Sequence, residues 1–340
     1  MSLFASLDIG SNTLRLLIGR FAGRKIIDIE TGRKITRLGS MVEKTGILQP
    51  GAMDASLNVL LEFLSAIRRY GVTNVRAVAT SALREARNSA SFIHQVREQT
   101  GIRIEVISGE KEAELTLRGI LYAFPKAEVG TMNRSRSAPA AGDADDSCRH
   151  PLFIMDIGGG SSEWIHYQGA GKTVMGSLPA GAIKLLQKCI TSDPVSDSDI
   201  ECLNHEIHSA CAPLESYTQH LKPESTLFIG TGGTFTTIAS VDLGLADYSR
   251  EKIHLHRIPL TGLLTMREKM LRLSLTEREN IQGLEPGRAD LIIPGLQFTM
   301  KVMETLRFNE LIISDYGLLE GVLLEMKEAI EKGLPEAGKP

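Results

Sequence analysis

The chain has 340 residues, of which 42% are hydrophobic and 23% charged, and its formal net charge is −3. This length allows two domains or one large one, and the apolar content excludes a chain that is disordered throughout. A charge so near neutral also argues against a general nucleic-acid coat, which needs excess basic charge to displace counterions. We therefore expect no nucleic-acid polymer among the partners.

Targeting and redox signals are sparse. No stretch approaches the roughly 18 apolar residues of a membrane span, and Asp8 arrives before any apolar signal-peptide region could form. The four cysteines include no C-x-x-C pair, so a structural zinc site is not indicated. These features predict a cytoplasmic protein with reduced thiols and no membrane partner.

In the first half, short apolar runs alternate with turns and amphipathic segments. Helices are predicted at 52–70, where leucines recur with the helical period, at 81–86, and from Ser108, which acids follow. Strands are predicted at Leu3–Leu7, Leu14–Ile18, Ile26–Glu30, Lys34–Leu38, Val75–Ala79 and Ile102–Ile107. Strands alternating with helices indicate the α/β class.

The segment 131–150 interrupts this alternation. It is rich in Ser, Ala, Gly and Pro, has balanced charge and contains no aromatic residue. Such a composition cannot bury a useful core. We expect a flexible surface insertion or linker, which would also mark a domain boundary.

The second half opens with a repetition of the first. Its first strand, at Leu152–Met155, leads into D-I-G-G-G-S at Asp156–Ser161, 148 residues after the D-I-G-S-N-T of Asp8–Thr13. Two strand–turn–strand starts with one signature suggest an internal duplication. Further helices are predicted at 197–221, 261–273, 289–306 and 317–331, and a further strand at Ile312–Asp315. We expect two similar α/β domains, 1–130 and 151–340, facing each other across a cleft.

The second repeated turn carries the clearest chemistry. Gly158, Gly159 and Gly160 can turn successive backbone N–H groups inward to form an anion nest beside Ser161. Asp156 next to a bound phosphate would be repulsive without a cation between them, which implies Mg²⁺ or a similar hard ion, and Glu163 could supply a second carboxylate. An ordinary glycine hairpin is the alternative interpretation.

Other candidates each have a structural alternative. Ser11, Asn12 and Thr13 can donate to phosphate from the facing turn, or form a plain turn. Gly232, Gly233 and Thr234 stand between an apolar strand and a helix start, which suits an anion but also close helix–strand packing. Arg84 could clamp a phosphate or pair with a surface acid. Glu110, Glu112 and Glu114 begin a helix and could serve its dipole, or one could be a general base.

Eight motifs then occur in one order. They are SLDIGSNTLRLLI, ATSALREA, ISGEKEAEL, FIMDIGGGSSEW, GSLPAGAIKL, FIGTGGTFTTIA, PGRADLIIPGL and ISDYGLLEGVL. In this order the chain resembles the exopolyphosphatase and guanosine pentaphosphate phosphatase (Ppx/GppA) family, which belongs to the superfamily of sugar kinases, actin and heat-shock chaperone ATPases. The resemblance covers nearly the whole chain outside 131–150.

The resemblance implies two ribonuclease-H-like α/β domains around a central cleft, and hydrolysis of a terminal phosphoanhydride of polyphosphate or guanosine pentaphosphate with Mg²⁺. It implies that Glu112 is the general base, that Asp156 and Glu163 are associated with the metal, and that Arg84, Gly158, Gly159, Gly160 and Ser161 bind phosphate. From the chemistry of the other two turns we add Asp8 as a metal candidate and, as phosphate-binding candidates, Ser11, Asn12, Thr13, Gly232, Gly233 and Thr234. A homodimer is compatible with the family.

Two departures from the family pattern stand out. Glu114 replaces a common arginine, which we expect to add negative charge near the base and weaken the binding of long polyanions. The chain also ends soon after its last predicted helix, so the C-terminal helical domains of longer members, including one of HD type, are expected to be absent.

Two rival functions fit the same superfamily. A small-molecule kinase would need an acceptor pocket and nucleoside contacts, for which the sequence has no distinct sign. A non-catalytic polyphosphate or nucleotide sensor would not need the Glu112, Asp156 and Glu163 set.

Overall fold

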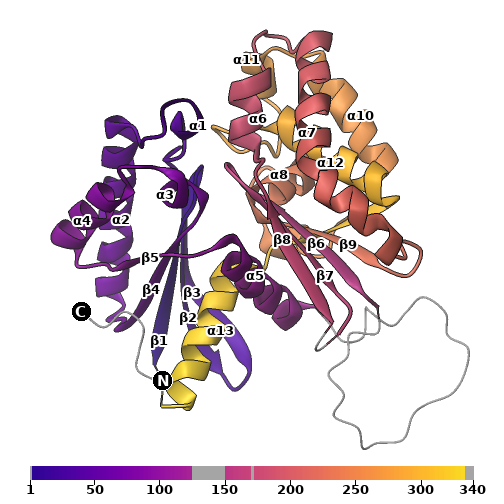
Figure 1. The fold of residues 1–340 in the computed structure, drawn as a ribbon. Helices are drawn as coiled ribbons and strands as arrows, with labels where there is room; N and C mark the ends of the chain where they lie inside the picture. The colour runs from indigo at the N-terminus through magenta and orange to yellow at the C-terminus, as the bar shows by residue number, and fades with distance from the viewer. Residues whose placement is uncertain (1, 125–149, 170–171, 334–340) are drawn as a thin grey trace, which may run out of the picture.

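The computed structural model describes residues 2–124, 150–169 and 172–333, and within them two β-sheets form the framework of two lobes (Figure 1). The first sheet has the strand order β3-β2-β1-β4-β5 and the second β10-β11-β9-β6-β7-β8. The strands of the first sheet are β1 (Leu3–Ile9), β2 (Thr13–Ala22), β3 (Lys25–Ile35), β4 (Asn74–Ala79) and β5 (Ile104–Val106). Those of the second are β6 (Leu152–Ile157), β7 (Ser162–Tyr167), β8 (Thr173–Leu178), β9 (Leu227–Thr231), β10 (Arg257–Pro259) and β11 (Glu310–Ser314).

The two sheets repeat one topology. Strand β1 pairs antiparallel with β2 and parallel with β4, and β6 pairs antiparallel with β7 and parallel with β9. The turns match as well, because the Gly10 N–H donates to the Thr13 carbonyl at 3.2 Å and the Gly158 N–H to the Ser161 carbonyl at 3.0 Å. The duplicated sequence signature therefore corresponds to a duplicated strand–turn–strand unit.

Helices cover both faces of the first sheet. The amphipathic helix α2 (Pro50–Arg69) and α4 (Ser89–Thr100) bury their apolar sides against one face, where Leu7, Leu60 and Phe92 belong to one core. The other face packs against α13 (Leu318–Glu331), whose Leu323 contacts Phe4 and Leu17. The short helices α1 (Val42–Thr45) and α3 (Ser81–Glu85) follow β3 and β4.

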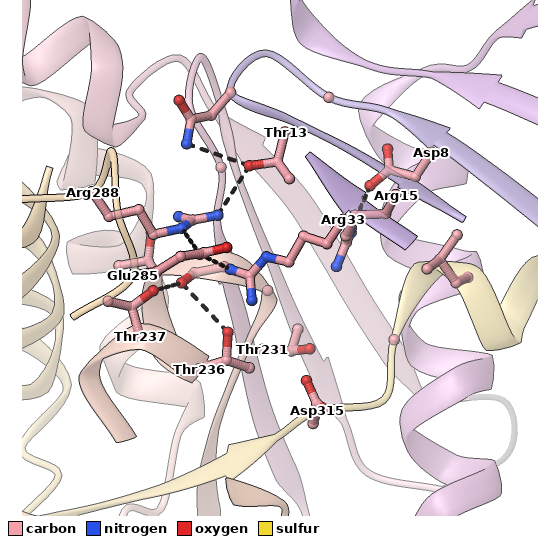
Figure 2. Close-up of a pocket in the computed structure, with 18 of the residues that line it drawn as sticks. Asp8, Thr13, Arg15, Arg33, Thr231, Thr236, Thr237, Glu285, Arg288 and Asp315 are labelled. Atoms are coloured by element: carbon pink, nitrogen blue, oxygen red, sulfur yellow. Dashed lines mark hydrogen bonds and ion pairs between the residues drawn. The ribbon is translucent and has the colours of Figure 1, made fainter. Parts of the chain in front are cut away.

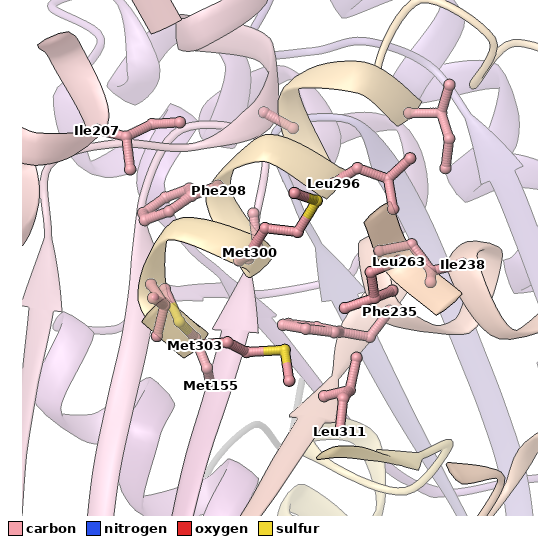
Figure 3. Packing of buried hydrophobic residues seen from close by; sticks show 14 of the residues in the cluster. Met155, Ile207, Phe235, Ile238, Leu263, Leu296, Phe298, Met300, Met303 and Leu311 are labelled. Carbon is pink, nitrogen blue, oxygen red and sulfur yellow. The ribbon is translucent and has the colours of Figure 1, made fainter. Parts of the chain in front are cut away.

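The second sheet has a thicker helical layer on one face. Figure 3 shows Phe298, Met300 and Met303 of the apolar helix α12 within this core, which also includes Met155 of β6 and Phe235. The layer consists of α6 (Ala182–Cys189), α7 (Asp197–Tyr217), α8 (Gly232–Asp242), α10 (Leu260–Leu271) and α12 (Ile292–Leu306), with the short α9 (Arg250–Ile253), α11 (Leu275–Arg278) and a 3₁₀ turn (Thr218–His220). The opposite face packs against α5 (Gly109–Ala123).

Helices α5 and α13 lie side by side between the two sheets (Figure 1). They approach closely through glycines: a Cβ on Gly119 would lie 1.9 Å from the Gly317 carbonyl oxygen, and one on Gly321 would lie 1.8 Å from that of Leu115. Although α13 falls within 151–340, it packs on the first sheet. The helix that carries Glu112 is thus held by both lobes.

Two expectations from the sequence are wrong. The strands expected at Ile26–Glu30 and Lys34–Leu38 are replaced by one strand, β3, whose pairing with the long β2 continues through a bulge at Ile18/Gly19 and ends at Ile35, so that 36–38 lie outside the sheet. The thiols expected to be reduced include a disulfide between Cys189 and Cys202. Packing of α6 on α7 brings their Cα atoms to 5.3 Å, within the range that a disulfide spans.

The segment 131–150 lies outside the described residues except for His150. Among the helices that the structure describes, none has the length and apolar character needed to cross a membrane.

Candidate active site

A cavity of about 840 Å³ opens between the two sheets, where their equivalent turns meet. Most of the residues expected from the sequence line it: Asp8, Ser11, Asn12, Thr13, Glu112, Asp156, Gly158, Gly159, Gly160, Ser161, Gly232, Gly233 and Thr234. Arg84 and Glu163 lie just behind this wall and hydrogen-bond to lining residues. The fold therefore brings together residues that are up to 226 positions apart, from Asp8 to Thr234.

The two turns face each other at contact distance. A Cβ on Gly159 would lie 3.0 Å from the Cβ of Ser11, and one on Gly160 would lie 2.2 Å from Ser81 Oγ. A side chain at Gly160 would therefore clash with Ser81 at the start of α3 in the other lobe. The glycines allow the two backbones to approach from opposite sides, which is the arrangement expected of two facing nests.

The third glycine loop begins helix α8 directly beside Asp156. Gly232 has a φ of +81°, and a Cβ there would lie 2.1 Å from Asp156 Oδ1. The Thr234 hydroxyl donates to the Ile157 carbonyl at 2.7 Å, which fixes the loop against β6. The close helix–strand packing given as the alternative is therefore present, and the loop also lines the cavity with the N-terminus of α8.

Glu112 enters the cavity from the first turn of α5. Ser108 caps this helix by accepting the Lys111 N–H at 3.1 Å, and the Glu112 side chain turns inward to a buried position. Arg84 donates to Glu112 Oε2 at 3.3 Å through one nitrogen and to Ser161 Oγ at 3.3 Å through another. One guanidinium therefore links the candidate base to the second glycine turn.

The carboxylates behind the turns repel one another. Burial, together with the charges of Glu163 and Asp156, raises the pKa of Glu112 well above its usual range, and the nearby Arg84 only partly opposes this. Burial likewise raises the pKa of Asp156 to about 7, although Arg15 lowers it. A cation at this place would relieve the repulsion.

Glu163 is held by two hydroxyls. Ser161 Oγ donates to Glu163 Oε1 at 2.9 Å and Ser177 Oγ donates to the same oxygen at 2.8 Å. Burial nevertheless raises the pKa of Glu163. Ser177 lies on β8 within the GSLPAGAIKL motif, and the pairing of β7 with β8 places it opposite Glu163, which the motif alone does not show.

The donor chemistry of this corner fits a hard cation that arrives with phosphate. Asp156 and Glu163 are opposite each other in the β6–β7 register, and both offer carboxylate oxygens. In the described part of the chain no group of three or more acidic, histidine or cysteine side chains could hold a metal ion. Mg²⁺ commonly needs only one or two carboxylates, with water and substrate phosphates completing its shell.

Asp8 has a different environment from Asp156. It forms an ion pair with Arg15, whose Nη2 lies 2.6 Å from Asp8 Oδ2 and whose Nε donates to that oxygen at 2.8 Å. Sequence reasoning missed Arg15. The spacing could have identified it, because Arg15 follows Asp8 by seven residues just as Glu163 follows Asp156 by seven residues in the other repeat.

The structure corrects the effect expected of Glu114. Two residues beyond Glu112 on a helix, it points to a different side of α5 and does not line the cavity. Its carboxylate instead pairs with Lys111 at 3.0 Å and Arg118 at 3.3 Å, near α13. Glu114 therefore adds no charge beside Glu112 in the cavity.

Two duplicated α/β lobes with facing glycine turns, an arginine and buried carboxylates enclose the cavity (Figure 2), an arrangement suited to phosphate groups. The Ppx/GppA phosphatase family model matches residues 17–132 and 148–329. The chain belongs to this family.

Individual relatives agree with this assignment. The chain is 27% identical over 337 residues to Exopolyphosphatase 2 of Mycobacterium tuberculosis, covering 95% of this chain and 98% of that protein. Its fold matches the crystal structure of an exopolyphosphatase from Cytophaga hutchinsonii with a TM-score of 0.82 at 25% identity, over 99% and 100% of the two chains. A Ppx/GppA family member from Aquifex aeolicus gives 0.73 at 27% identity, over 97% and 98%.

The comparisons confirm the family expected from the eight motifs, the two-lobed α/β fold and the enzyme class, a phosphatase. The roles of individual site residues rest on the geometry above and are taken up as proposals.

Proposed function

We propose that the chain hydrolyses the terminal phosphoanhydride of inorganic polyphosphate or guanosine pentaphosphate, with Glu112 as the base. The observation that supports this most strongly is the bridge that Arg84 makes between Glu112 and Ser161, at 3.3 Å to each. It places a carboxylate beside the turn where a phosphate would lie. Relatives named as exopolyphosphatases favour polyphosphate as the substrate class.

The proposed reaction depends mainly on positioning. Backbone N–H groups of the two facing turns and the Arg84 guanidinium would hold the terminal phosphate and offset its charge. Glu112 would orient a water molecule and accept its proton. The raised pKa of Glu112 makes this carboxylate a stronger base than an exposed one, provided that the pH keeps it ionised.

Asp156 and Glu163 are the residues that would hold Mg²⁺. Asp8 is a weaker candidate for this role, because its carboxylate is already paired with Arg15. The ion would supply positive charge to the phosphate oxygens. Because both carboxylates are buried, a phosphate beside their ionised forms would need a cation to offset the combined negative charge.

The test is the Glu112→Gln variant, which keeps the shape of the side chain but removes the base. Phosphate release from polyphosphate and from guanosine pentaphosphate should fall by about 10²–10⁴ under saturating substrate, while substrate binding persists. Glu110→Gln is the matched control, because it removes an equal charge from the same helical turn at an exposed position outside the cavity.

A Glu112→Gln rate within about threefold of wild type would rule out Glu112 as the base. ATP with a panel of small acceptor molecules belongs in the same assay, because phosphate transfer to an acceptor in place of release would indicate a kinase. Tight binding without any release would indicate a sensor.

A further inference from the structure

The start of helix α5, which carries Glu112, contacts the second lobe at Ser177. Gly109 is the first residue of α5, and a Cβ placed on it would lie 2.8 Å from Ser177 Cβ and 3.1 Å from Ser177 Oγ. At such distances a side chain at position 109 would displace either the helix or the strand. The backbone of α5 therefore rests directly on the side chain of Ser177.

The same serine holds Glu163. The two residues are opposite each other in the β7–β8 register, and the Ser177 hydroxyl donates to Glu163 Oε1 at 2.8 Å. Ser161 donates to that oxygen as well, at 2.9 Å. Two hydroxyls on one oxygen restrict the rotation of this carboxylate, which is only 2% exposed. Ser177 thus lies between the candidate metal ligand and the helix of the candidate base.

The first lobe fixes the other side of the same helix start. The Ile107 N–H donates to the Ala79 carbonyl at 3.0 Å, just before the cap of α5. Arg84 donates to the Ile107 carbonyl at 2.9 Å. The first turn of α5 is therefore bonded to the first lobe and rests on the second lobe at Ser177. The contact at Ser177 sets the separation between the candidate base and the candidate metal ligand.

We propose that Ser177 is a positioning residue of the reaction, which holds Glu163 in the orientation that Mg²⁺ needs and spaces it from Glu112 through its contact with Gly109. Ser177 does not belong to the described residues that line the cavity, so it acts through the two carboxylates and not on the substrate. The roles of these carboxylates rest on the proposed function, whereas the contacts of Ser177 do not depend on it.

The first experiment measures Mn²⁺ binding by electron paramagnetic resonance in the presence of orthophosphate, so its readout does not depend on hydrolysis. Ser177→Ala should weaken Mn²⁺ binding about tenfold or more, because Glu163 loses one of the two hydroxyls that orient it. Ser177→Thr retains the hydroxyl, and its added methyl has room because Ser177 is exposed. Mn²⁺ binding by Ser177→Thr should therefore stay close to that of wild type.

Thr173→Ala is the matched control. It also removes a hydroxyl from β8, on the same face of the strand as Ser177, but its position is opposite Tyr167 and away from Glu163. This variant should leave Mn²⁺ binding unchanged.

A second set of variants tests the spacing. Gly109→Ala should lower the rate of phosphate release at saturating substrate about tenfold or more, because its Cβ meets Ser177 and moves the first turn of α5. Ser177→Gly removes the atoms that this Cβ would meet. Adding Ser177→Gly to Gly109→Ala should therefore restore part of the lost rate, although Ser177→Gly alone lowers the rate. A general loss of folding does not produce opposite effects of one change in two backgrounds.

Two results would overturn the positioning role. One is Mn²⁺ binding that is unchanged in Ser177→Ala, or weakened equally in Ser177→Ala and Ser177→Thr. The other is a double variant of Gly109→Ala and Ser177→Gly whose rate is lower than that of Gly109→Ala alone, because the contact would then not set the spacing.

The Glu112→Gln assay distinguishes this proposal from the proposed function. A normal rate of Glu112→Gln together with weakened Mn²⁺ binding by Ser177→Ala would exclude Glu112 as the base and leave the orientation of Glu163 by Ser177 intact. A rate lost in Glu112→Gln together with wild-type Mn²⁺ binding by Ser177→Ala would leave the proposed function intact and exclude Ser177 as a positioning residue.

Discussion

Arg15 and Glu163 occupy equivalent positions in the two halves of the molecule. Each faces, in strand register, the aspartate that precedes its turn: Arg15 faces Asp8 and Glu163 faces Asp156. The first pair is neutralised at 2.6 Å, whereas the second places two carboxylates opposite each other. In the first repeat the aspartate is therefore paired with an arginine, whereas in the second repeat the equivalent aspartate faces another carboxylate and has no such counter-charge from that position.

This asymmetry predicts where a cation acts. Asp156→Asn should raise the Mg²⁺ concentration needed for half-maximal phosphate release, because it removes one of the two carboxylate ligands proposed for the ion. Asp8→Asn should affect the Mg²⁺ requirement less, since Arg15 already occupies that carboxylate. A magnesium titration of both variants measures this, and undiminished release by wild-type protein in EDTA would exclude the ion from the reaction.

Arg84 should affect both rate and pH dependence. Arg84→Ala removes the guanidinium that donates to Ser161 and is proposed to bind the terminal phosphate, and it should lower kcat/KM by about 10²–10³. The variant should also move the acidic limb of the pH–rate profile to higher pH, because Arg84 lowers the pKa of Glu112. Arg87→Ala, at an exposed position three residues along, is the control. An unshifted limb would show that Arg84 does not influence the titrating group.

Asp199 provides a test of stability outside the cavity. Burial alone would raise its pKa, but hydrogen bonds from Ser192 and Thr191 outweigh burial and hold the pKa well below its usual range. A depressed carboxyl pKa stabilises the fold above the unfolded value of about 4 and loses that contribution as the pH falls below it.

Asp199→Asn should therefore reduce the free energy of unfolding by about 1–3 kcal/mol at neutral pH. The difference from wild type should shrink toward pH 3. Denaturant titrations at several pH values measure this, and a difference that stays constant with pH would contradict the assignment of the effect to the ionised carboxylate.

Polyphosphate should be released after each cut. Arg250 lines the cavity together with three acids that pair with it, Asp28, Asp315 and Glu320. This part of the cavity is therefore negative, and few remote contacts hold the polymer between cycles. A gel time course with excess long polyphosphate should show the whole band shifting gradually downward. Full-length polymer persisting beside free phosphate, with no intermediates, would instead demonstrate processive hydrolysis.

The sequence was most informative where local pattern and chemistry coincide. The repeated turns after Asp8 and Asp156 follow strands whose apolar runs are evident, so their facing arrangement could be predicted from duplication. Glu112 could be separated from Glu114 only through family resemblance. The charge effect assigned to Glu114 then failed, because side-chain direction on a helix changes by about 100° per residue.

Contacts between the lobes could not be predicted for a different reason. Arg33 and Arg288 are 255 residues apart, and both pair with Glu285 in the cavity only because β3 and the loop before α12 come from opposite lobes. No periodicity or spacing in the sequence predicts that these two side chains lie close together. The Cys189–Cys202 disulfide was missed likewise, since it depends on how α6 and α7 pack.

The place of α13 has a consequence for the order in which the protein can be built. Strands β1 to β5 have all been synthesised by residue 106, but the helix that covers Phe4 and Leu17 begins only at residue 318. At 5–20 residues per second, those 318 − 106 = 212 residues take roughly 10–40 s to translate. Throughout that interval the nascent first lobe exposes an apolar sheet face, so its folding is completed only after α13 has left the ribosome.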